Sequence, residues 1–597
     1  MSKARAMKQL TTPWGSALDP QRIKPEYPRP NLVRDSFLNL NGAWDCRICR
    51  SGEDAPRYEG TILVPFPPEA ALSGVGVVVR PEDELYYRRC FTLPEGFVRG
   101  RVLLHFGAVD QECSVLLNGQ RIGGHCGGYL PFSFDITDAL AAGENTLEVR
   151  VRDRTEKAPY ARGKQKIDNN GPLNSLFYTP CSGIWKTVWM ESVPQAHITG
   201  VRMTPRFADA QIDMLIDAAC PGTAQVEILF AGETVWRGEA QTGQPLRADL
   251  PGFHPWSPDT PNLYDVAITF GGDSVRSYFG MRSFGTRRAA DGVMRFYLNG
   301  EPFFFNGLLD QGYWPDSLLT PTCDDALEHD ILTAKRLGYN TLRKHIKVEE
   351  ERFYYLCDRL GMVVWQDMPC GGGDYNMLFV TYLPNGLEFA QRCIPDRLYG
   401  LFARGDAQGR AQFYEELEGM VRLLYNYPCI ALWTPFNEGW GQFDAPKATA
   451  LIRSVDSTRL INEACGWFDQ GGGDLYSIHN YLRRLKVSPK KDRVVALTEY
   501  GGYAYPVPGH LACEKEFGYK AYRSAQELTA AYTRLIEEEV LPAVANGLSA
   551  AIYTQVSDIE EEINGLMTYD RAVLKPDEDV LRALNARLYA AYAAAVR

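Results

Sequence analysis

The sequence lacks long apolar runs and any excess of positive charge. No stretch approaches the roughly 18 consecutive apolar residues of a membrane-crossing helix, and no apolar segment follows the basic first residues as in a signal peptide. Lys and Arg number 63 against 74 Asp and Glu, a formal net charge of -11. Nucleic acids and anionic membranes need clustered Lys and Arg, so neither is an expected partner. We expect a cytoplasmic protein that acts on a neutral or small substrate.

We also expect no closely spaced cysteine pairs in this chain. The 14 cysteines are spread along it, for example at Cys46, Cys90 and Cys113, and we interpret each as a single residue. Zinc and redox motifs use cysteine pairs at short spacing. In a reducing compartment, single cysteines are typically buried free thiols. We therefore expect no cysteine-based metal or redox site.

The length and the strand-like pattern of the first half indicate several domains. A chain of 597 residues is too long for one ordinary core. Short apolar runs alternate with turns over about 85–153, and Asn118-Gly119 between two of them is a strong hairpin signal. A second β-rich stretch includes a Pro-rich turn at 255–261. We predict a jelly-roll β-sandwich over 1–193 and an immunoglobulin-like β-sandwich over 194–286.

The second half changes to strands that alternate with helical segments. Apolar residues recur at helical spacing, as at Phe353, Leu356 and Leu360, and short apolar strands follow the helices. Such alternation over roughly 310 residues predicts an eightfold (β/α)8 TIM barrel at 287–597. The stretch 370–407 has no clear period, and we expect a long loop over the barrel mouth.

Two apolar runs of the second half each end in a glutamate. The run 430–436 precedes Asn437 and Glu438, and the run 494–498 precedes Glu499. Both have the composition of buried parallel strands, and barrel enzymes keep their chemistry at the C-terminal strand ends. Two carboxylates at one barrel mouth suit glycoside hydrolysis, in which one protonates the leaving oxygen and the other attacks. The pattern favours a sugar-cleaving enzyme.

Ordered motifs along nearly the whole chain resemble glycoside hydrolase family 2, whose members include β-galactosidases, β-glucuronidases and β-mannosidases. The motifs lie at 38–44, 86–91, 106–110 and 115–119 in the first half, and at 340–367 and 425–438 in the barrel. The resemblance implies a retaining exo-β-glycosidase with the three predicted domains.

The resemblance also implies roles for individual residues. In that family the glutamate of the Asn-Glu pair is the general acid and base, here Glu438, and the later glutamate is the nucleophile, here Glu499. The counterpart of Asn437 binds the sugar 2-hydroxyl, and that of Arg343 orients the nucleophile. Tyr481 lies where the family places a tyrosine against the nucleophile.

Further residues are candidates for contacts to the sugar, with ordinary loop or core positions as the alternative. They are His345, His479, Asp310, Gln311, Trp314 and Trp440. Polar and aromatic side chains of this kind line sugar sites. We also expect Trp433 and Trp440 to flank Glu438 and raise its pKa.

The sugar itself is less well defined by the sequence. Galactoside is the first expectation because it is the commonest activity in the family, and because Asn564 lacks the lysine two residues on that β-glucuronidases use to bind the sugar carboxylate. Lys344 or Lys347 supplying that charge would instead favour β-glucuronidase. Arabinosides, furanosides and mannosides stay open, and a catalytically inactive carbohydrate-binding protein is the rival of another class.

We predict metal-independent catalysis and no cofactor. Large β-galactosidases of the family use a magnesium site with a Glu-x-His element before the acid/base strand, and 371–375 shows no such element. The acidic run 558–562 is expected to be an exposed charged turn. A homo-oligomer is possible.

Overall fold

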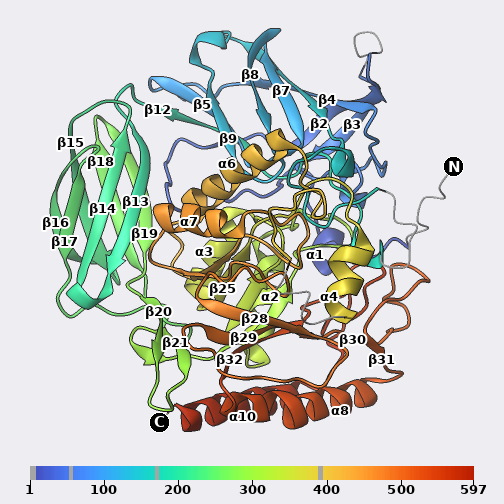
Figure 1. Cartoon of the computed structure of the whole chain (residues 1–597). Helices are drawn as coiled ribbons and strands as arrows, with labels where there is room; N and C mark the ends of the chain where they lie inside the picture. The colour runs from blue at the N-terminus through green and yellow to red at the C-terminus, as the bar shows by residue number, and fades with distance from the viewer. Residues whose placement is uncertain (1–7, 53–57, 168–173, 387–393, 597) are drawn as a thin grey trace.

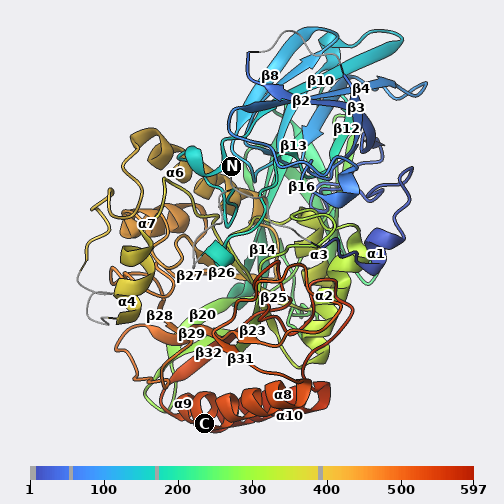
Figure 2. The same ribbon diagram turned by 90° about the vertical axis from the view of Figure 1, so that its right-hand side faces the viewer.

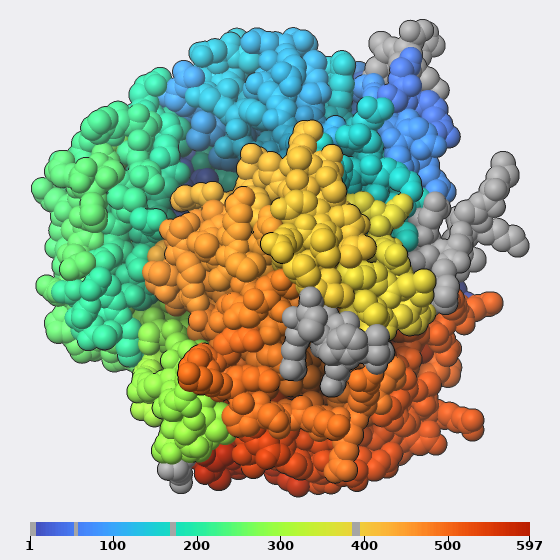
Figure 3. Space-filling model, in the orientation of Figure 1, coloured from blue at the N-terminus to red at the C-terminus, as the bar shows by residue number. Residues whose placement is uncertain are grey.

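The computed structural model describes residues 8–52, 58–167, 174–386 and 394–596. Three parts follow one another along the chain: a β-sandwich at the top of Figure 1, a second β-sandwich at the left, and a barrel with its helices below and in the centre. Figure 3 shows the three parts packed against one another. The predicted fold class is confirmed, while the domain limits at 193/194 and 286/287 stay predictions.

The first sandwich packs a six-stranded sheet on a four-stranded one. The six-stranded sheet has the order β3 (Gly60–Val64), β2 (Gly42–Arg50), β4 (Asp83–Thr92), β10 (Glu144–Arg152), β7 (Glu112–Leu117) and β8 (Gln120–Cys126). The other has the order β1 (Leu38–Asn39), β12 (Val188–Val193), β5 (Arg101–Phe106) and β9 (Phe132–Asp135), and β6 (Val109–Asp110) pairs with β11 (Gly183–Ile184). The predicted hairpin at Asn118-Gly119 joins β7 and β8, and both residues have positive φ, as a two-residue turn of this kind requires.

One part of the cysteine interpretation is wrong. Cys46 and Cys49 are spaced as Cys-x-x-Cys and both lie on β2. Residues three apart on a strand point to opposite faces, and Cys46 is in the sandwich core while Cys49 is half-buried. The two thiols therefore cannot share a metal ion or a disulfide, and no disulfide joins any cysteines in the described ranges.

The second sandwich has two antiparallel sheets. One contains β13 (Ile198–Arg206), β14 (Gln211–Ala218) and β17 (Pro245–Asp249), and the other contains β16 (Glu233–Gln241), β15 (Thr223–Phe230), β18 (Tyr264–Phe270) and β19 (Asp273–Phe279). Buried and exposed residues alternate along β14 and β18, as expected for strands with one face in a core. A small sheet of β20 (Phe284–Arg288), β21 (Met294–Leu298) and β22 (Glu301–Pro302) follows and leads into the barrel.

The barrel is a single parallel sheet of eight strands. In chain order they are β23 (Phe305–Asp310), β24 (Thr341–Lys344), β25 (Val363–Asp367), β26 (Ile430–Thr434), β27 (Leu460–Ile461), β28 (Leu475–Asn480), β29 (Val494–Gly501) and β32 (Leu548–Thr554). The first and last strands pair, and each strand neighbours the next except that β27 and β28 are not paired, so the barrel is nearly closed.

Helices surround the barrel strands (Figure 2). They are α2 (Asp324–Arg336), α3 (Glu351–Leu360), α6 (Ala407–Leu424), α7 (Ala445–Val455), α8 (Ala525–Leu535), η7 (Ile536–Val540), α9 (Leu541–Ala545) and α10 (Glu578–Ala595). Gly361 ends α3 in the left-handed conformation, which favours glycine. The alternation is incomplete, because 462–474 and 481–493 contain no helix. Within the described ranges, none of the helices has the length and apolar character needed to cross a membrane.

The expected loop at 370–407 is partly helical. It contains η6 (Leu378–Tyr382) and α4 (Leu383–Gly386), while 387–393 lie outside the described residues. Its first part pairs with the N-terminal half of the chain, since Ala161 forms a β-bridge with Gly371.

The N-terminal half reaches the barrel through two segments. The start of the chain includes α1 (Pro13–Ser16) and is held by Lys24, which forms a buried ion pair with Glu350. The second segment, residues 155–167 and 174–187, is called the connector below. Its Tyr178 hydroxyl donates to Glu562 and its Thr179 amide donates to Glu560. The expectation of an exposed acidic turn is therefore wrong: these glutamates are buried because the connector covers them.

Candidate active site

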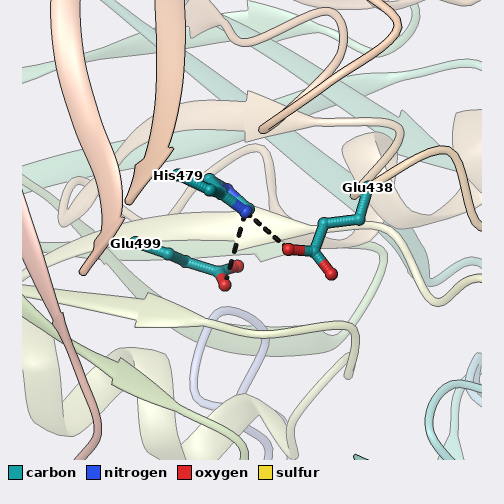
Figure 4. Close-up of side chains that lie close together, drawn as sticks. All are labelled: Glu438, His479 and Glu499. Carbon is teal, nitrogen blue, oxygen red and sulfur yellow. Dashed lines mark hydrogen bonds and ion pairs between the residues drawn. The ribbon is translucent and has the colours of Figure 1, made fainter. Parts of the chain in front are cut away.

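The two glutamates and a histidine meet at the C-terminal ends of the barrel strands (Figure 4). Glu499 lies in β29, and His479, in the neighbouring strand β28, is its register partner. Glu438 follows β26, and its backbone amide bonds to the carbonyl of Cys465. The φ of Glu438 is +51°, a conformation that is uncommon for a residue other than glycine and recurs at functional sites.

His479 bridges the two carboxylates. Its Nδ1 lies 2.7 Å from Oε1 of Glu438 and 3.4 Å from Oε2 of Glu499. Its side chain is fully buried, while Glu438 is 12% exposed and Glu499 5% exposed. Glu438 is therefore the more accessible of the two carboxylates.

The electrostatics of this cluster separate the two glutamates. Burial and the neighbouring charge of Glu499 raise the pKa of Glu438. Burial alone would raise the pKa of Glu499 as well, but the charges of His479 and Arg343 lower it to about 2. Burial would lower the pKa of His479, but the Glu499 carboxylate, Cys465 and the hydrogen bond to Glu438 together outweigh it and raise that pKa to about 10. Opposite shifts in a carboxylate pair are what acid and nucleophile roles require.

Arg343, near the end of β24, binds the carboxylate of Glu499, the candidate nucleophile. Its guanidinium is fully buried, and Nη1 donates to Oε1 of Glu499 at 2.9 Å. Asp367 balances the charge through contacts at 2.9 and 3.2 Å. A paired, hydrogen-bonded guanidinium fixes the position of a carboxylate, so Arg343 is placed to orient Glu499.

The same guanidinium orients Asn437. Nη2 of Arg343 donates to Oδ1 of Asn437 at 2.7 Å. Since a guanidinium can only donate, the amide oxygen must face it, and the Nδ2 group faces the other way. No bond from Nδ2 to another described residue is found, so this donor is available to a ligand.

Tyr481 contacts the other oxygen of Glu499. Its hydroxyl donates to Oε2 at 2.5 Å and lies 2.9 Å from Oγ1 of Thr554. The phenol ring stacks on Tyr519 with ring centres 3.7 Å apart. Both carboxylate oxygens of Glu499 therefore have fixed donors, one from Arg343 and one from Tyr481.

His345 is held beside this network. Its Nδ1 lies 2.8 Å from Oδ2 of Asp367. Burial and the charge of Lys164 lower the pKa of His345 well below its usual value, so the ring is neutral. Nδ1–H then donates to Asp367, and Nε2 is left as an acceptor.

The two tryptophans near Glu438 differ. Trp433 is fully buried and donates to Asp456 at 2.9 Å on the outer side of the barrel, so it does not flank the acid. Trp440 lies in an aromatic stack with Phe177 and Tyr375, at 5.3 and 6.2 Å between ring centres. The connector, through Phe177, therefore helps to build the wall beside Glu438.

Three of the sugar-binding candidates lie in packed interior. Asp310 forms an ion pair with Lys344 at 2.7 Å. Gln311 donates to Tyr178 and to Gln555. Trp314 is 1% exposed, with its ring against Trp14 and Arg571. We leave these three out of the proposed sugar site, because their side chains are occupied within the protein.

The two lysines that the sequence offers for a sugar carboxylate are also occupied. Glu349 binds Lys347 at 2.5 Å and Lys344 at 3.2 Å, and all three are buried. Lys347 also donates to the carbonyls of Gly312 and Leu319. Neither lysine has its charge free for a ligand.

Three side chains of the site have the donor set of a metal centre. One ligand atom each of Glu438, His479 and Glu499 lie within 4.8 Å of one another. The raised pKa of His479 means that a metal ion would have to displace a proton from its ring to bind there. Metal-independent catalysis stays a prediction.

Four residues near the site did not come from the sequence analysis: Asp367 as the partner of Arg343, Thr554, Tyr519 and Lys164 of the connector. Asp367 ends an apolar strand, β25, and the strand-end pattern that identified Glu438 would have found it. The other three carry no local signal, because packing between distant segments brings them to the mouth.

Comparison with known families agrees with this architecture. Residues 77–186 match the model of the glycosyl hydrolase 2 galactose-binding domain-like family, 196–282 that of glycosyl hydrolases family 2, and 291–586 that of its TIM barrel domain. Together the three matches cover most of the chain. The chain belongs to glycoside hydrolase family 2.

Individual relatives are distant. A β-galactosidase of Thermoanaerobacter pseudethanolicus is 24% identical over 71% of this chain, and a putative β-glucuronidase of Formosa agariphila is 27% identical over 56%. The chain spans only 55% and 37% of the lengths of these two proteins. A solved β-glucuronidase of Bifidobacterium dentium, complexed with coumarin-3-O-glucuronide, has a TM-score of 0.72 at 21% identity and covers 93% of this chain and 98% of its own. At that identity the likeness supports the fold alone.

Proposed function

We propose that the protein is a retaining exo-β-glycosidase, with Glu438 as general acid and base and Glu499 as nucleophile. The observation that carries the proposal is the closeness of the two carboxylates, of which one oxygen each lie within 4.8 Å. Retaining enzymes hold their carboxyl groups roughly 5–5.5 Å apart, whereas inverting enzymes need roughly 6.5–9.5 Å to admit a water. The short separation supports retention.

In the first step, the ionised Glu499 attacks the anomeric carbon while Glu438 gives its proton to the glycosidic oxygen. The bond to the aglycone breaks, and a covalent glycosyl-enzyme forms. The low pKa of Glu499 and the raised pKa of Glu438 supply the two protonation states that this step needs. The Nδ2 donor of Asn437, which faces away from Arg343, supports a role for this residue in binding the sugar 2-hydroxyl.

In the second step, Glu438 removes a proton from water, and the hydroxide attacks the anomeric carbon and releases Glu499. His479 serves both steps in the same position. Before the first step its charge lies beside the Glu499 carboxylate, and in the intermediate it lies beside the Glu438 carboxylate at 2.7 Å. The negative charge thus moves between two partners of one fixed cation, which needs no rearrangement of the site.

Two glycones are supported to a comparable degree. β-Galactoside is the first, in agreement with the sequence and with the name of the Thermoanaerobacter relative. A β-uronide is the second, in agreement with the name of the Formosa relative. The specific observation that favours the uronide is Lys164, which lies next to Trp440 without an anionic partner among the described residues.

The test is hydrolysis of 4-nitrophenyl glycosides by wild type, Glu499→Ala and Glu438→Ala. The panel contains β-galactoside, β-glucuronide, β-galacturonide, β-glucoside, β-mannoside and α-arabinofuranoside. Wild type should cleave one clearly best, and Glu499→Ala should be inactive. Glu438→Ala should keep glycosylation by this good leaving group, and azide, which needs no general base, should restore turnover with a β-glycosyl azide as product.

The same experiment separates the rival functions. Proton NMR of the wild-type reaction should show the β-anomer of the sugar as the first product, and an α-anomer would contradict retention. Equal activity of Glu499→Ala and wild type would remove Glu499 from the mechanism. Sugar binding without turnover of any substrate would favour an inactive carbohydrate-binding protein.

A further inference from the structure

A buried lysine of the connector lies beside Trp440, close to the mouth of the barrel. Lys164 is 7% exposed, and its Nζ lies 5.5 Å from the ring centre of Trp440 and 5.7 Å from that of Tyr178. Trp440 is two residues beyond Glu438. No hydrogen bond or ion pair of Nζ to any residue of the described ranges is found.

The backbone around Lys164 is fixed on both sides. The amide of Gly163 bonds to the carbonyl of Cys370, and the amide of Tyr178 bonds to the carbonyl of Lys164. Gly163 has a φ of +64°, and a Cβ there would lie 2.5 Å from the Tyr129 hydroxyl. The neighbouring Gln165 is anchored to Asp110 at 2.8 Å. The position of Lys164 is therefore built into the fold.

A buried ammonium without an anionic partner costs free energy that the two aromatic faces offset only in part. Three other buried cations near the barrel mouth are paired with carboxylates: Arg343 with Glu499 and Asp367, and Lys344 and Lys347 with Glu349. Arg162 and Arg404 have no carboxylate partner either, but they donate to backbone carbonyls, whereas no hydrogen bond of the Lys164 ammonium is found within the described ranges. The charge of Lys164 reaches the site, since it lowers the pKa of both Glu438 and His345.

We propose that Lys164 is a substrate-binding residue that takes the carboxylate of the bound sugar. This inference rests on the proposed function, because it places the sugar between Glu438 and Glu499. The chemical class of substrate is then a β-uronide, and the connector determines specificity. A carboxylate would give the ammonium its missing partner through a charge-assisted hydrogen bond.

The test compares wild type, Lys164→Met and the control Lys157→Met on aryl β-uronides and on the matching neutral glycosides. Lys157 belongs to the same connector, but it is exposed and pairs only loosely with Asp374 at 3.9 Å. Lys164→Met should lower kcat/KM for the uronide about 10- to 100-fold, as expected for a lost hydrogen bond to a charged group, and change the neutral glycoside less than about threefold. Lys157→Met should change neither.

Two further measurements show whether the carboxylate that Lys164 binds belongs to the sugar or to the leaving group, and test binding without turnover. A carboxyphenyl β-galactoside carries the charge on the leaving group, and a loss confined to this substrate would overturn the proposal. Calorimetric titration with free galacturonate, glucuronate, galactose and glucose should show uronate binding that is lost in Lys164→Met. Thermal unfolding of each variant should match wild type within a few degrees.

The outcomes distinguish the two proposals. Turnover of neutral glycosides only, with no uronate binding, overturns the role of Lys164 and leaves the glycosidase. An equal loss on neutral and anionic substrates in Lys164→Met overturns it too, because the lysine would then be structural. Uronate binding lost in Lys164→Met, without turnover of any substrate, supports Lys164 and overturns the glycosidase.

Discussion

Nδ1 of His479 lies 2.7 Å from Oε1 of Glu438, and the ring is completely buried. A protonated imidazole at this distance donates a charge-assisted hydrogen bond, which leaves Oε2 of Glu438 to carry the catalytic proton. The Nε2 side contacts Cys465 at 3.2 Å, so the ring has no freedom to rotate away. His479, expected from the sequence to bind sugar, is therefore better explained as a positioning residue between the two carboxylates.

Replacement of His479 by glutamine should move the pH profile to higher pH. The His479 charge lowers the pKa of Glu499, and its hydrogen bond lowers that of Glu438. Without it both pKa values rise, so the acidic limb, where Glu499 ionises, and the basic limb, where Glu438 loses its proton, should both shift upward. The measurement is kcat/KM against pH for the best aryl glycoside.

A suitable control is His510→Gln. His510 contacts Asp570 at the same 2.7 Å but touches neither glutamate, so its loss should leave both limbs in place. Limbs that stay unchanged in His479→Gln would show that the ring does not set the protonation of the pair.

Replacement of Asn437 by alanine should remove a contact to the sugar 2-hydroxyl. Arg343 fixes the amide so that Nδ2 is presented to a ligand, and a single lost hydrogen bond at this position should lower kcat/KM about 10-fold. On a 2-deoxy glycoside the same substitution should have little further effect, because the hydroxyl is already missing. If the losses in kcat/KM from Asn437→Ala and from removal of the 2-hydroxyl were additive, Asn437 would contact another part of the substrate.

The central part of the site follows from the sequence because each residue lies at or just after the C-terminal end of a predicted strand. Apolar runs predicted β26 and β29, and the C-terminal ends of barrel strands face one mouth, so Glu438 and Glu499 had to converge. Asn437 came with its neighbour, and Arg343 ends the short strand β24. The barrel itself followed from the alternation of elements.

The rest depends on long-range packing that local pattern does not contain. Asp310 and Trp314 resemble loop residues in sequence, but the start of the chain covers this loop, for example through Trp14 against Trp314. The acidic residues around Glu561 look like a solvated turn until the connector is packed on them, with Ser175 donating to Glu561. Lys164 lies far from both glutamates in sequence, so no motif near them indicates it.

Replacement of Tyr481 by phenylalanine should slow catalysis by disturbing the nucleophile. Its hydroxyl donates to Glu499 at 2.5 Å, and without this bond the pKa of Glu499 rises, because the hydrogen bond lowers it. We expect kcat to fall about 10- to 100-fold, as for a lost bond to a charged group, and the acidic limb to move to higher pH. Pre-steady-state kinetics would show which of the two steps slows.

Tyr500→Phe is the matched control for this prediction. Tyr500 follows Glu499 on the same strand and therefore points to the opposite face, where its ring packs against Tyr553 at 5.5 Å. It should leave kcat within about twofold. Equal effects of the two substitutions would mean that loss of either hydroxyl merely loosens β29.

Replacement of Asp310 by alanine should reduce stability and spare catalysis. Oδ2 of Asp310 lies 2.7 Å from Nζ of Lys344, and both side chains are buried, so the substitution leaves the lysine with only its longer contact to Glu349. Breaking a buried ion pair costs about 3 kcal/mol or more. Denaturant unfolding should show this loss, whereas Asp325→Ala, an exposed position in the first turn of α2, should cost less than about 1 kcal/mol.

The folded fraction of Asp310→Ala should retain kcat/KM within about threefold. Preserved stability with a large loss of kcat/KM would instead make Asp310 a sugar ligand, because loss of its buried contacts to Lys344 and to the Gly312 amide should lower the free energy of unfolding.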